Sequence, residues 1–186
     1  MKLKLPPGGV HLKKSNAKRK GKLFEEKVAK IIHEFLYENF HEYKDLIDNF
    51  DSSIGVKRDK DSGVSIDSKG DIELGIGVKF YPFAIECKKR EDLDISIKVI
   101  SNIRKSKLYT IYKNQAKKKA KEKNLFPLLI FSRNYTKPFV FVDLKDLSEV
   151  IRGKIKNIIY RFNHILVDDI LIISLDEFNK IILEVM

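Results

Sequence analysis

Acidic and basic side chains gather near the middle of the chain, in two neighbouring segments. Asp71 precedes a short apolar run, and Glu86 and Lys88 occupy alternate positions of the apolar segment 83–88. Alternate side chains of a strand share a face, so Glu86 and Lys88 are predicted to point the same way and Cys87 toward the core. Two carboxylates can hold a hard divalent cation such as Mg²⁺, and an ammonium group beside them can position or activate water. Attack of water on a phosphodiester uses this combination.

A helix is predicted upstream of these acids, from Lys20 to about Phe40. Its apolar residues recur at helical spacing, at Phe24, Val28, Ile31, Ile32, Phe35 and Leu36. Glu25 borders this apolar stripe, whereas Glu26 lies on the face predicted to be exposed to solvent. The sequence therefore predicts one carboxylate beside the buried apolar stripe of the first helix.

Each acidic group has an ordinary structural alternative. Glu86 and Lys88 could be an ion pair on a solvated strand. Asp71 follows a glycine, and Gly-Asp usually marks a turn. Glu25 could be an acid favoured in the first turn of a helix by the macrodipole. No single position settles the function.

Taken in order, these elements resemble the PD-(D/E)xK nuclease superfamily, and archaeal Holliday junction resolvases within it. Asp71 matches the first acid, although glycine precedes it where the family name has proline, and segment 86–88 matches the (D/E)xK triplet. Glu25 matches the helix glutamate that opens such chains. The resemblance spans roughly residues 20–133. It implies a restriction-endonuclease-like α/β core with a central mixed sheet flanked by helices.

The resemblance also implies roles for individual residues. Asp71, Glu86 and the main-chain carbonyl of Cys87 would bind Mg²⁺ or Mn²⁺. Lys88 would position or deprotonate the attacking water, and Glu25 would orient it or bind a second ion. Gln115 falls where related nucleases carry a helix glutamine that faces the site, although glutamine is also an ordinary helix former.

A Ser-Gly element belongs to the same family order, and Ser62 with Gly63 is its counterpart here. Ser65 and Ser68 are alternatives for the same role. All of them fall in the polar loop 58–70, which is rich in Asp, Ser and Gly.

The chain has 186 residues and a formal charge of +11, and its basic residues are unevenly placed. Residues 2–22 contain no acid and include Lys18, Arg19, Lys20 and Lys22. A second basic cluster begins just before a helix predicted over 106–123 and continues along it, and only Glu122 is acidic there. Its members include Arg104, Lys105, Lys117, Lys118, Lys119 and Lys121. Such segments bind phosphate backbones with little sequence readout. One alternative is that this helix is simply exposed to solvent. Membrane binding is a weaker alternative, because the 117–123 run has little apolar surface opposite its lysines.

The organisation predicted from these patterns is a flexible basic arm (1–22), a nuclease core (23–149) and a strand–helix extension (150–186). Strands are predicted at 53–57, at 72–76 and 82–88 as an acidic hairpin, and at 125–131 paired with 138–142. The extension would complete the sheet or form a dimer contact. Its residues Ser174 and Glu177 have the spacing of a helix start with a serine cap.

Composition narrows the classes of protein. The single cysteine excludes an internal disulfide framework and favours a buried thiol in a reducing cytoplasm. No apolar run is long enough to cross a bilayer. The histidines lack metal spacing, and no glycine-rich nucleotide loop is present, so zinc and nucleotide cofactors are not expected.

The predicted function is a metal-dependent endonuclease that cuts DNA. The resemblance to resolvases implies a homodimer that cuts branched junctions, which have two-fold symmetry. A restriction, phage or repair nuclease, an RNA-processing nuclease and a non-catalytic nucleic-acid-binding module are the alternatives. The sequence does not separate DNA from RNA, because no RNA-specific motif appears.

Overall fold

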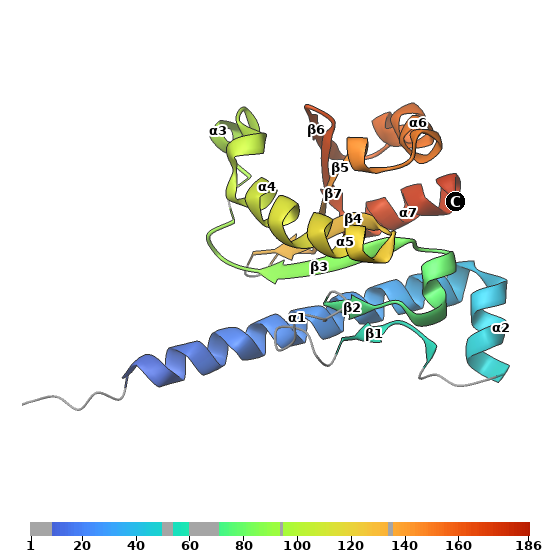
Figure 1. The fold of residues 1–186 in the computed structure, drawn as a ribbon, viewed down its shortest axis with the longest axis horizontal. Coiled ribbons are helices and arrows are strands. Elements are labelled where there is room, and N and C mark those ends of the chain that lie inside the picture. Colours follow the sequence, from blue (N-terminus) through green and yellow to red (C-terminus); the bar gives the residue numbers. More distant parts are fainter. Residues whose placement is uncertain (1–8, 50–53, 60–70, 94, 134–135) are drawn as a thin grey trace, which may run out of the picture.

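The computed structural model describes residues 9–49, 54–59, 71–93, 95–133 and 136–186 (Figure 1). The helices are α1 (Gly9–Asn39), α2 (His41–Asn49), α3 (Ile97–Ile100), α4 (Lys107–Ile111), α5 (Lys117–Lys123), α6 (Glu149–Ile158) and α7 (Leu175–Val185). The strands are β1 (Lys57–Arg58), β2 (Ile72–Glu73), β3 (Phe83–Lys89), β4 (Phe126–Ser132), β5 (Phe139–Asp143), β6 (His164–Val167) and β7 (Ile170–Ser174).

A five-stranded mixed sheet in the order β3-β4-β5-β7-β6 forms the centre of the fold. β3 and β4 run parallel, and the remaining neighbours are antiparallel. The predicted pairing of segments 125–131 and 138–142 is confirmed as β4–β5, with Leu129 opposite Phe141. The predicted α/β class, with a central mixed sheet flanked by helices, is confirmed as well.

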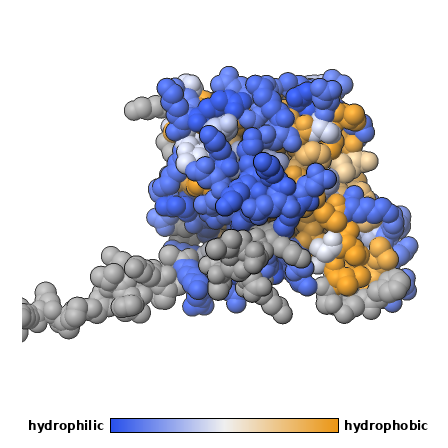
Figure 2. Space-filling model, viewed as in Figure 1, coloured by the Kyte–Doolittle hydropathy of each residue, from blue (hydrophilic) through white to orange (hydrophobic). Residues whose placement is uncertain are grey.

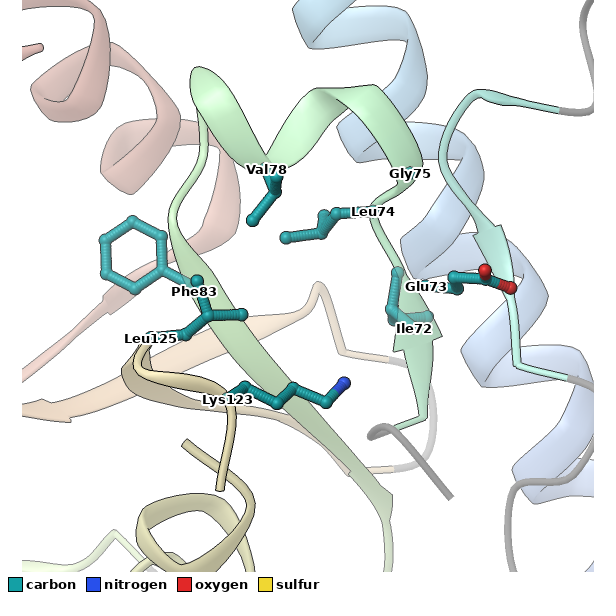
Figure 3. A pocket seen from close by; sticks show the side chains of 8 residues that line it. All are labelled: Ile72, Glu73, Leu74, Gly75, Val78, Phe83, Lys123 and Leu125. Carbon is teal, nitrogen blue, oxygen red and sulfur yellow. The ribbon is translucent and has the colours of Figure 1, made fainter. Parts of the chain in front are cut away.

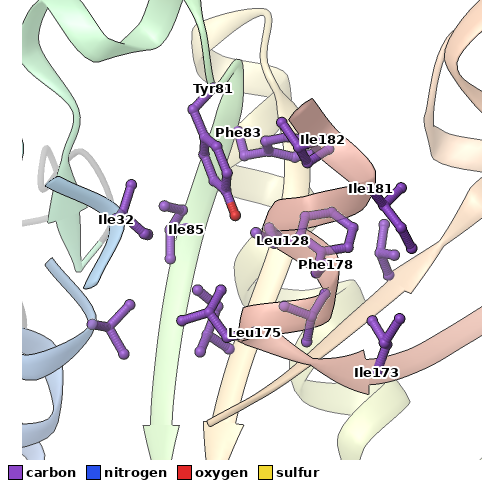
Figure 4. Close-up of a cluster of buried hydrophobic side chains, with 14 of the residues drawn as sticks. Ile32, Tyr81, Phe83, Ile85, Leu128, Ile173, Leu175, Phe178, Ile181 and Ile182 are labelled. Carbon is purple, nitrogen blue, oxygen red and sulfur yellow. The ribbon is translucent and has the colours of Figure 1, made fainter. Parts of the chain in front are cut away.

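Helices cover both faces of the sheet. One apolar cluster joins α1, α6 and α7 to the sheet, and Figure 4 shows Phe178 of α7 among Tyr81, Phe83 and Leu128. A second cluster joins α4, with Tyr112 and Ala116 just after it, to Leu129, Phe131 and Phe141 on the opposite face. Ile85 and Cys87 belong to the first cluster, so Glu86 and Lys88, at alternate positions, face the α4–α5 side.

The first helix is longer than the sequence pattern indicates. α1 begins at Gly9, so residues 9–22 of the predicted flexible arm are helical. No proline follows Pro7 in this segment, and lysine, arginine, alanine and leucine are all good helix formers. The basic segment therefore extends a helix that is packed on the sheet at its other end, where Val28, Ile32 and Leu36 are fully buried.

The chain around the first two strands differs from the prediction. Ser53 lies outside the described residues, and strand β1 begins only at Lys57. Gly55 packs so closely on α2 that a Cβ there would lie 2.8 Å from the Ile47 side chain, and this contact bends the chain before the strand. The predicted strand 72–76 ends at Glu73, because Gly75 has φ +53° and starts a 3₁₀ turn over Gly75–Lys79.

The predicted acidic hairpin is not a hairpin. β2 pairs with β1 in a separate two-stranded sheet, and β3 pairs with β4 instead. In Figure 1, β2 lies beside β1, drawn over α1 and below β3. The sequence pattern could not show this, because a short turn between two apolar segments also fits a crossover to another sheet.

The helix predicted over 106–123 contains a π-turn. α4 begins after Ser106, whose side chain accepts a hydrogen bond from the Tyr109 amide, and α5 ends at Lys123. Between them, Tyr112–Ala116 adopts the wider π geometry. The serine cap predicted at Ser174 is confirmed, since its hydroxyl accepts a hydrogen bond from the Glu177 amide.

Candidate active site

The free edge of β3 positions Asp71. β3 is the outermost strand of the central sheet, so one side of its backbone pairs with no strand in the described part of the chain. The Asp71 amide donates to the Ile85 carbonyl at 3.0 Å, and the Asp71 carboxylate accepts from the Cys87 amide at 2.6 Å. Asp71 therefore satisfies buried backbone groups of an open edge, and this contact places its carboxylate beside Glu86.

Four charged side chains meet at this edge, and we call Asp71, Glu86, Lys88 and Lys119 the carboxylate–lysine cluster. Asp71 is 5% exposed and Glu86 is 2% exposed. Lys88 bonds to one oxygen of Glu86, and its Nζ lies 3.8 Å from Asp71 Oδ2. Lys119 Nζ lies 2.6 Å from the other oxygen of Glu86 and 3.8 Å from Asp71 Oδ1. Two ammonium groups therefore bridge one pair of buried carboxylates.

Glu25 of α1 lies next to this cluster and is held by Arg58 of β1. Arg58 Nε donates to Glu25 Oε2 at 2.6 Å, and both side chains are largely buried. Burial raises the pKa of the Glu25 carboxyl, and the negative charge of Asp71 raises it further, although Arg58 opposes the shift. The charge of Asp71 thus reaches Glu25, whose carboxyl holds a proton more tightly than that of an exposed glutamate.

The neighbours of Glu86 on β3 have altered pKa values. Burial lowers the pKa of the Lys88 ammonium, but the charges of Glu86 and Asp71 outweigh this effect and raise it. Lys88 is therefore protonated at neutral pH. Burial, followed by the charges of Asp71 and Glu86, raises the pKa of the Cys87 thiol well above its usual value. Cys87 stays a neutral thiol, as expected of a buried structural cysteine.

The donor set suits a hard cation. Asp71 and Glu86 offer carboxylate oxygens, which Mg²⁺ and Mn²⁺ prefer. The N–H and C=O of one strand residue point to the same side, so the Cys87 carbonyl faces the same edge as its amide. Within the described residues, no three His, Cys, Asp or Glu side chains lie close enough to form a ready metal cluster. The two ammonium groups show that this position attracts positive charge.

A family described as "Phage putative PDDEXK endonuclease" matches residues 16–185. The chain belongs to this family. It is therefore a member of the PD-(D/E)xK nuclease superfamily, a nuclease whose substrate is nucleic acid, and its mixed five-stranded sheet agrees with the restriction-endonuclease-like fold. No curated protein and no solved structure matches the chain. The match runs through both the predicted core and the predicted extension.

The predicted site residues of this nuclease fall into three groups. Asp71, Glu86 and Lys88 come together with the backbone of Cys87, and Glu25 lies beside them. Gln115 is half-buried in the π-turn, one helical turn before Lys119. Ser62 lies outside the described residues, as do its alternatives.

The predicted DNA-binding residues are also divided. The side chains of Lys18, Arg19, Lys20, Lys22, Lys105, Lys118 and Lys121 are exposed. Arg104 instead bonds to Asp143 at 2.9 Å and to the Asp168 carbonyl, and Lys117 bonds to Asp146 at 2.7 Å. Figure 2 shows a hydrophilic surface over α4 and α5, where part of this basic set lies.

Two residues of the site were not predicted as site residues, Arg58 and Lys119. Arg58 carries no motif that marks it. Lys119 was assigned only to the basic helix, although it follows Gln115 by one helical turn, and that spacing was the signal available.

A hollow of about 230 Å³ lies between β2 and the end of α5 and is lined by Phe83, Leu74 and Lys123 among others (Figure 3), but not by Asp71 or Glu86. No helix of the described part is long and apolar enough to cross a membrane.

Proposed function

We propose that this nuclease hydrolyses DNA phosphodiester bonds with a divalent cation, Mg²⁺ or Mn²⁺, held by Asp71, Glu86 and the Cys87 carbonyl. The observation that carries the proposal is the buried carboxylate pair at the edge of β3, which lies 2.6–3.8 Å from the ammonium group of Lys119. A binding module would not place two buried acids where it meets phosphate, because they would repel it. Bound there, the cation would neutralise charge on the phosphate and lower the pKa of a coordinated water.

The side chains around the cation site would orient the reactants. Lys88, kept protonated by its two acidic neighbours, would position the attacking water and stabilise negative charge rather than accept a proton. Glu25, with its raised pKa, would take the proton of that water or orient it, and Arg58 would fix the carboxyl. Water would add to phosphorus and the bond to the 3′ oxygen would break, leaving a 3′-hydroxyl and a 5′-phosphate.

The exposed basic residues would bind the DNA backbone. Lys18, Arg19, Lys20 and Lys22 line the first half of α1, and Lys105, Lys118 and Lys121 lie on the segment before α4 and on α5. Arg104 and Lys117 would instead stabilise the fold through Asp143 and Asp146. Each phosphate contact that is lost would make the negative slope of log K against log salt less steep by about 0.9.

The kind of substrate separates the remaining candidates. Junction cutting would follow from the resemblance to resolvases, whereas the family description names a phage endonuclease and specifies no DNA structure. A two-fold junction would require a homodimer.

Val78, Leu183 and Met186 are exposed apolar side chains, and apolar residues gather beside α7 and the 3₁₀ turn (Figure 2). We propose this face as the dimer contact, to be tested by light scattering of the wild type and Leu183→Glu.

The deciding experiment measures cleavage of labelled four-way junction, duplex, single-stranded DNA and RNA with Mg²⁺, Mn²⁺ or EDTA. Asp71→Asn and Glu86→Gln remove one charge each while keeping size, and Glu122→Gln on α5 is the matched control. We expect metal-dependent cutting that both site variants abolish and the control retains, with binding unchanged in order of magnitude. Salt-sensitive binding without cutting in any metal would leave the non-catalytic module, and cutting of RNA alone would leave the RNA-processing nuclease.

A further inference from the structure

Lys119 occupies the site in a way that the (D/E)xK triplet does not account for. The triplet supplies one lysine, Lys88, from β3 itself. Lys119 comes from α5, yet its Nζ lies 2.6 Å from Glu86 Oε2 and 3.8 Å from Asp71 Oδ1. Its side chain is 22% exposed, whereas its neighbours Lys118 and Lys121 are exposed. One lysine of a basic run is thus withdrawn from the surface into the site.

The fold fixes this placement. Ala116 and Ala120 are buried at 0% and 2%, and their small side chains bring the helix close to the sheet. Lys117 and the Tyr112 hydroxyl both bond to Asp146, at 2.7 and 2.8 Å, and so fix the rotation of the helix on the other side. The π-turn Tyr112–Ala116 lies directly before Lys117, and such turns frequently occur at functional sites.

We propose that Lys119 is a second active-site cation, which holds the carboxylate pair when no metal is bound and moves to the scissile phosphate when a divalent cation takes its place. This inference rests on the proposed metal-dependent function. The two carboxylates are balanced by two ammonium groups, so a divalent ion between them would leave an excess of positive charge. One ammonium must withdraw, and the tethers of the two lysines differ.

Lys88 stays near Glu86 because both are on the same face of one strand. Lys119 reaches Glu86 from another element through a flexible four-carbon stem, so its ammonium can move without any change in β3. A lysine ammonium is a point charge with rotatable donors and binds phosphate oxygens in many orientations. Lys119 is therefore the one of the two that can leave the carboxylates and follow the substrate.

The first test is a calorimetric titration of the full chain with MnCl₂ alone. Lys119→Met keeps the stem and removes the charge that competes with the cation, and Lys118→Met on the same helix is the control. We expect Lys119→Met to bind Mn²⁺ about tenfold more tightly than the wild type, and Lys118→Met to bind it equally. Should Lys119→Met fail to fold, as judged by circular dichroism, Lys119→Gln replaces it.

The second readout is cleavage at saturating Mn²⁺, where we expect Lys119→Met to be at least tenfold slower and Lys119→Arg to recover part of the rate. If the wild type binds Mn²⁺, Asp71→Asn abolishes this binding, and Lys119→Met binds no more tightly, Lys119 does not compete with the metal and only this inference is overturned. If neither the wild type nor Lys119→Met binds Mn²⁺, the proposed metal site fails and Lys119 has no such role. Tighter binding with unchanged cleavage would overturn the contact with phosphate.

Discussion

Asp71 is predicted to have a structural role that can be separated from its chemical role. Its carboxylate accepts a hydrogen bond of 2.6 Å from the Cys87 amide, which is buried at the edge of β3. Asp71→Ala leaves this amide without an acceptor, whereas the side-chain oxygen of Asp71→Asn still accepts. Both variants lose the negative charge. The difference in stability between them therefore isolates this hydrogen bond.

An unsatisfied buried amide costs about 1–3 kcal/mol. We expect Asp71→Ala to unfold in urea with a free energy about 1–3 kcal/mol below that of Asp71→Asn. For a chain of this size, the same difference corresponds to a Tm lower by roughly 2–12 °C. Both variants are expected to lack nuclease activity, since neither retains the acid.

The assay is urea unfolding without metal, monitored by far-UV circular dichroism. The free energy of unfolding must depend on urea concentration with the same slope in the wild type and both variants. Hydrogen exchange of the Cys87 amide adds a local readout: it should stay protected in Asp71→Asn and lose protection in Asp71→Ala. Equal stability of the two variants, together with equal protection of this amide, would refute the assignment of Asp71 to the edge of β3.

Three further predictions concern the acid beside the cluster, the core and the thiol. The pKa of Glu25 is raised in the folded state, so the protonated carboxyl stabilises the fold relative to the ionised one. This stabilisation is fully present at low pH and is lost as the pH rises through the folded-state pKa. Thermal melts at pH values below and well above 4.5 should show Glu25→Gln gaining stability relative to the wild type as pH rises; a pH-independent difference would contradict the shift. Phe178→Ala should lower the free energy of unfolding by about 3–5 kcal/mol in urea titrations, since the ring is fully buried with its centroid 5.7 Å from that of Phe83, whereas Val150→Ala, at a position that is 68% exposed, should change it little. Cys87 should react with a thiol reagent far more slowly in the native protein than in urea, because it is 4% exposed and its pKa is raised; equal rates would show an accessible thiol.

Elements defined by their own residues were predictable from the sequence. The apolar runs of β4 and β5 and the serine cap of α7 depend on local composition, and the structure has all of them. The end of α1 at Asn39 agrees with the predicted helix end near Phe40.

Elements defined by distant contacts were not predictable. Gly55 and Gly75 each pack against other segments, and a Cβ at Gly75 would lie 1.9 Å from the Ile54 carbonyl oxygen. The close approach at Gly55 precedes the late start of β1, and the one at Gly75 follows the early end of β2. The choice of β4 rather than β2 as the partner of β3 is likewise a property of the whole sheet, which no local pattern contains.

The candidate site shows the same division within one run of lysines. Glu86 and Lys88 share a face because a strand alternates, and Asp71 follows from the order of the acids, so those three could be predicted. Lys117, Lys118 and Lys119 are the same residue type. Helical spacing predicts that their side chains point in different directions, but it does not predict which residues each side chain meets. The structure pairs Lys117 with Asp146, exposes Lys118 and brings Lys119 to Glu86. What separates them is the π-turn and the two buried alanines that set the rotation and depth of the helix. A basic helix of this kind therefore combines structural, surface and candidate-site lysines, and its net charge alone overestimates how many of them are available to contact a nucleic acid.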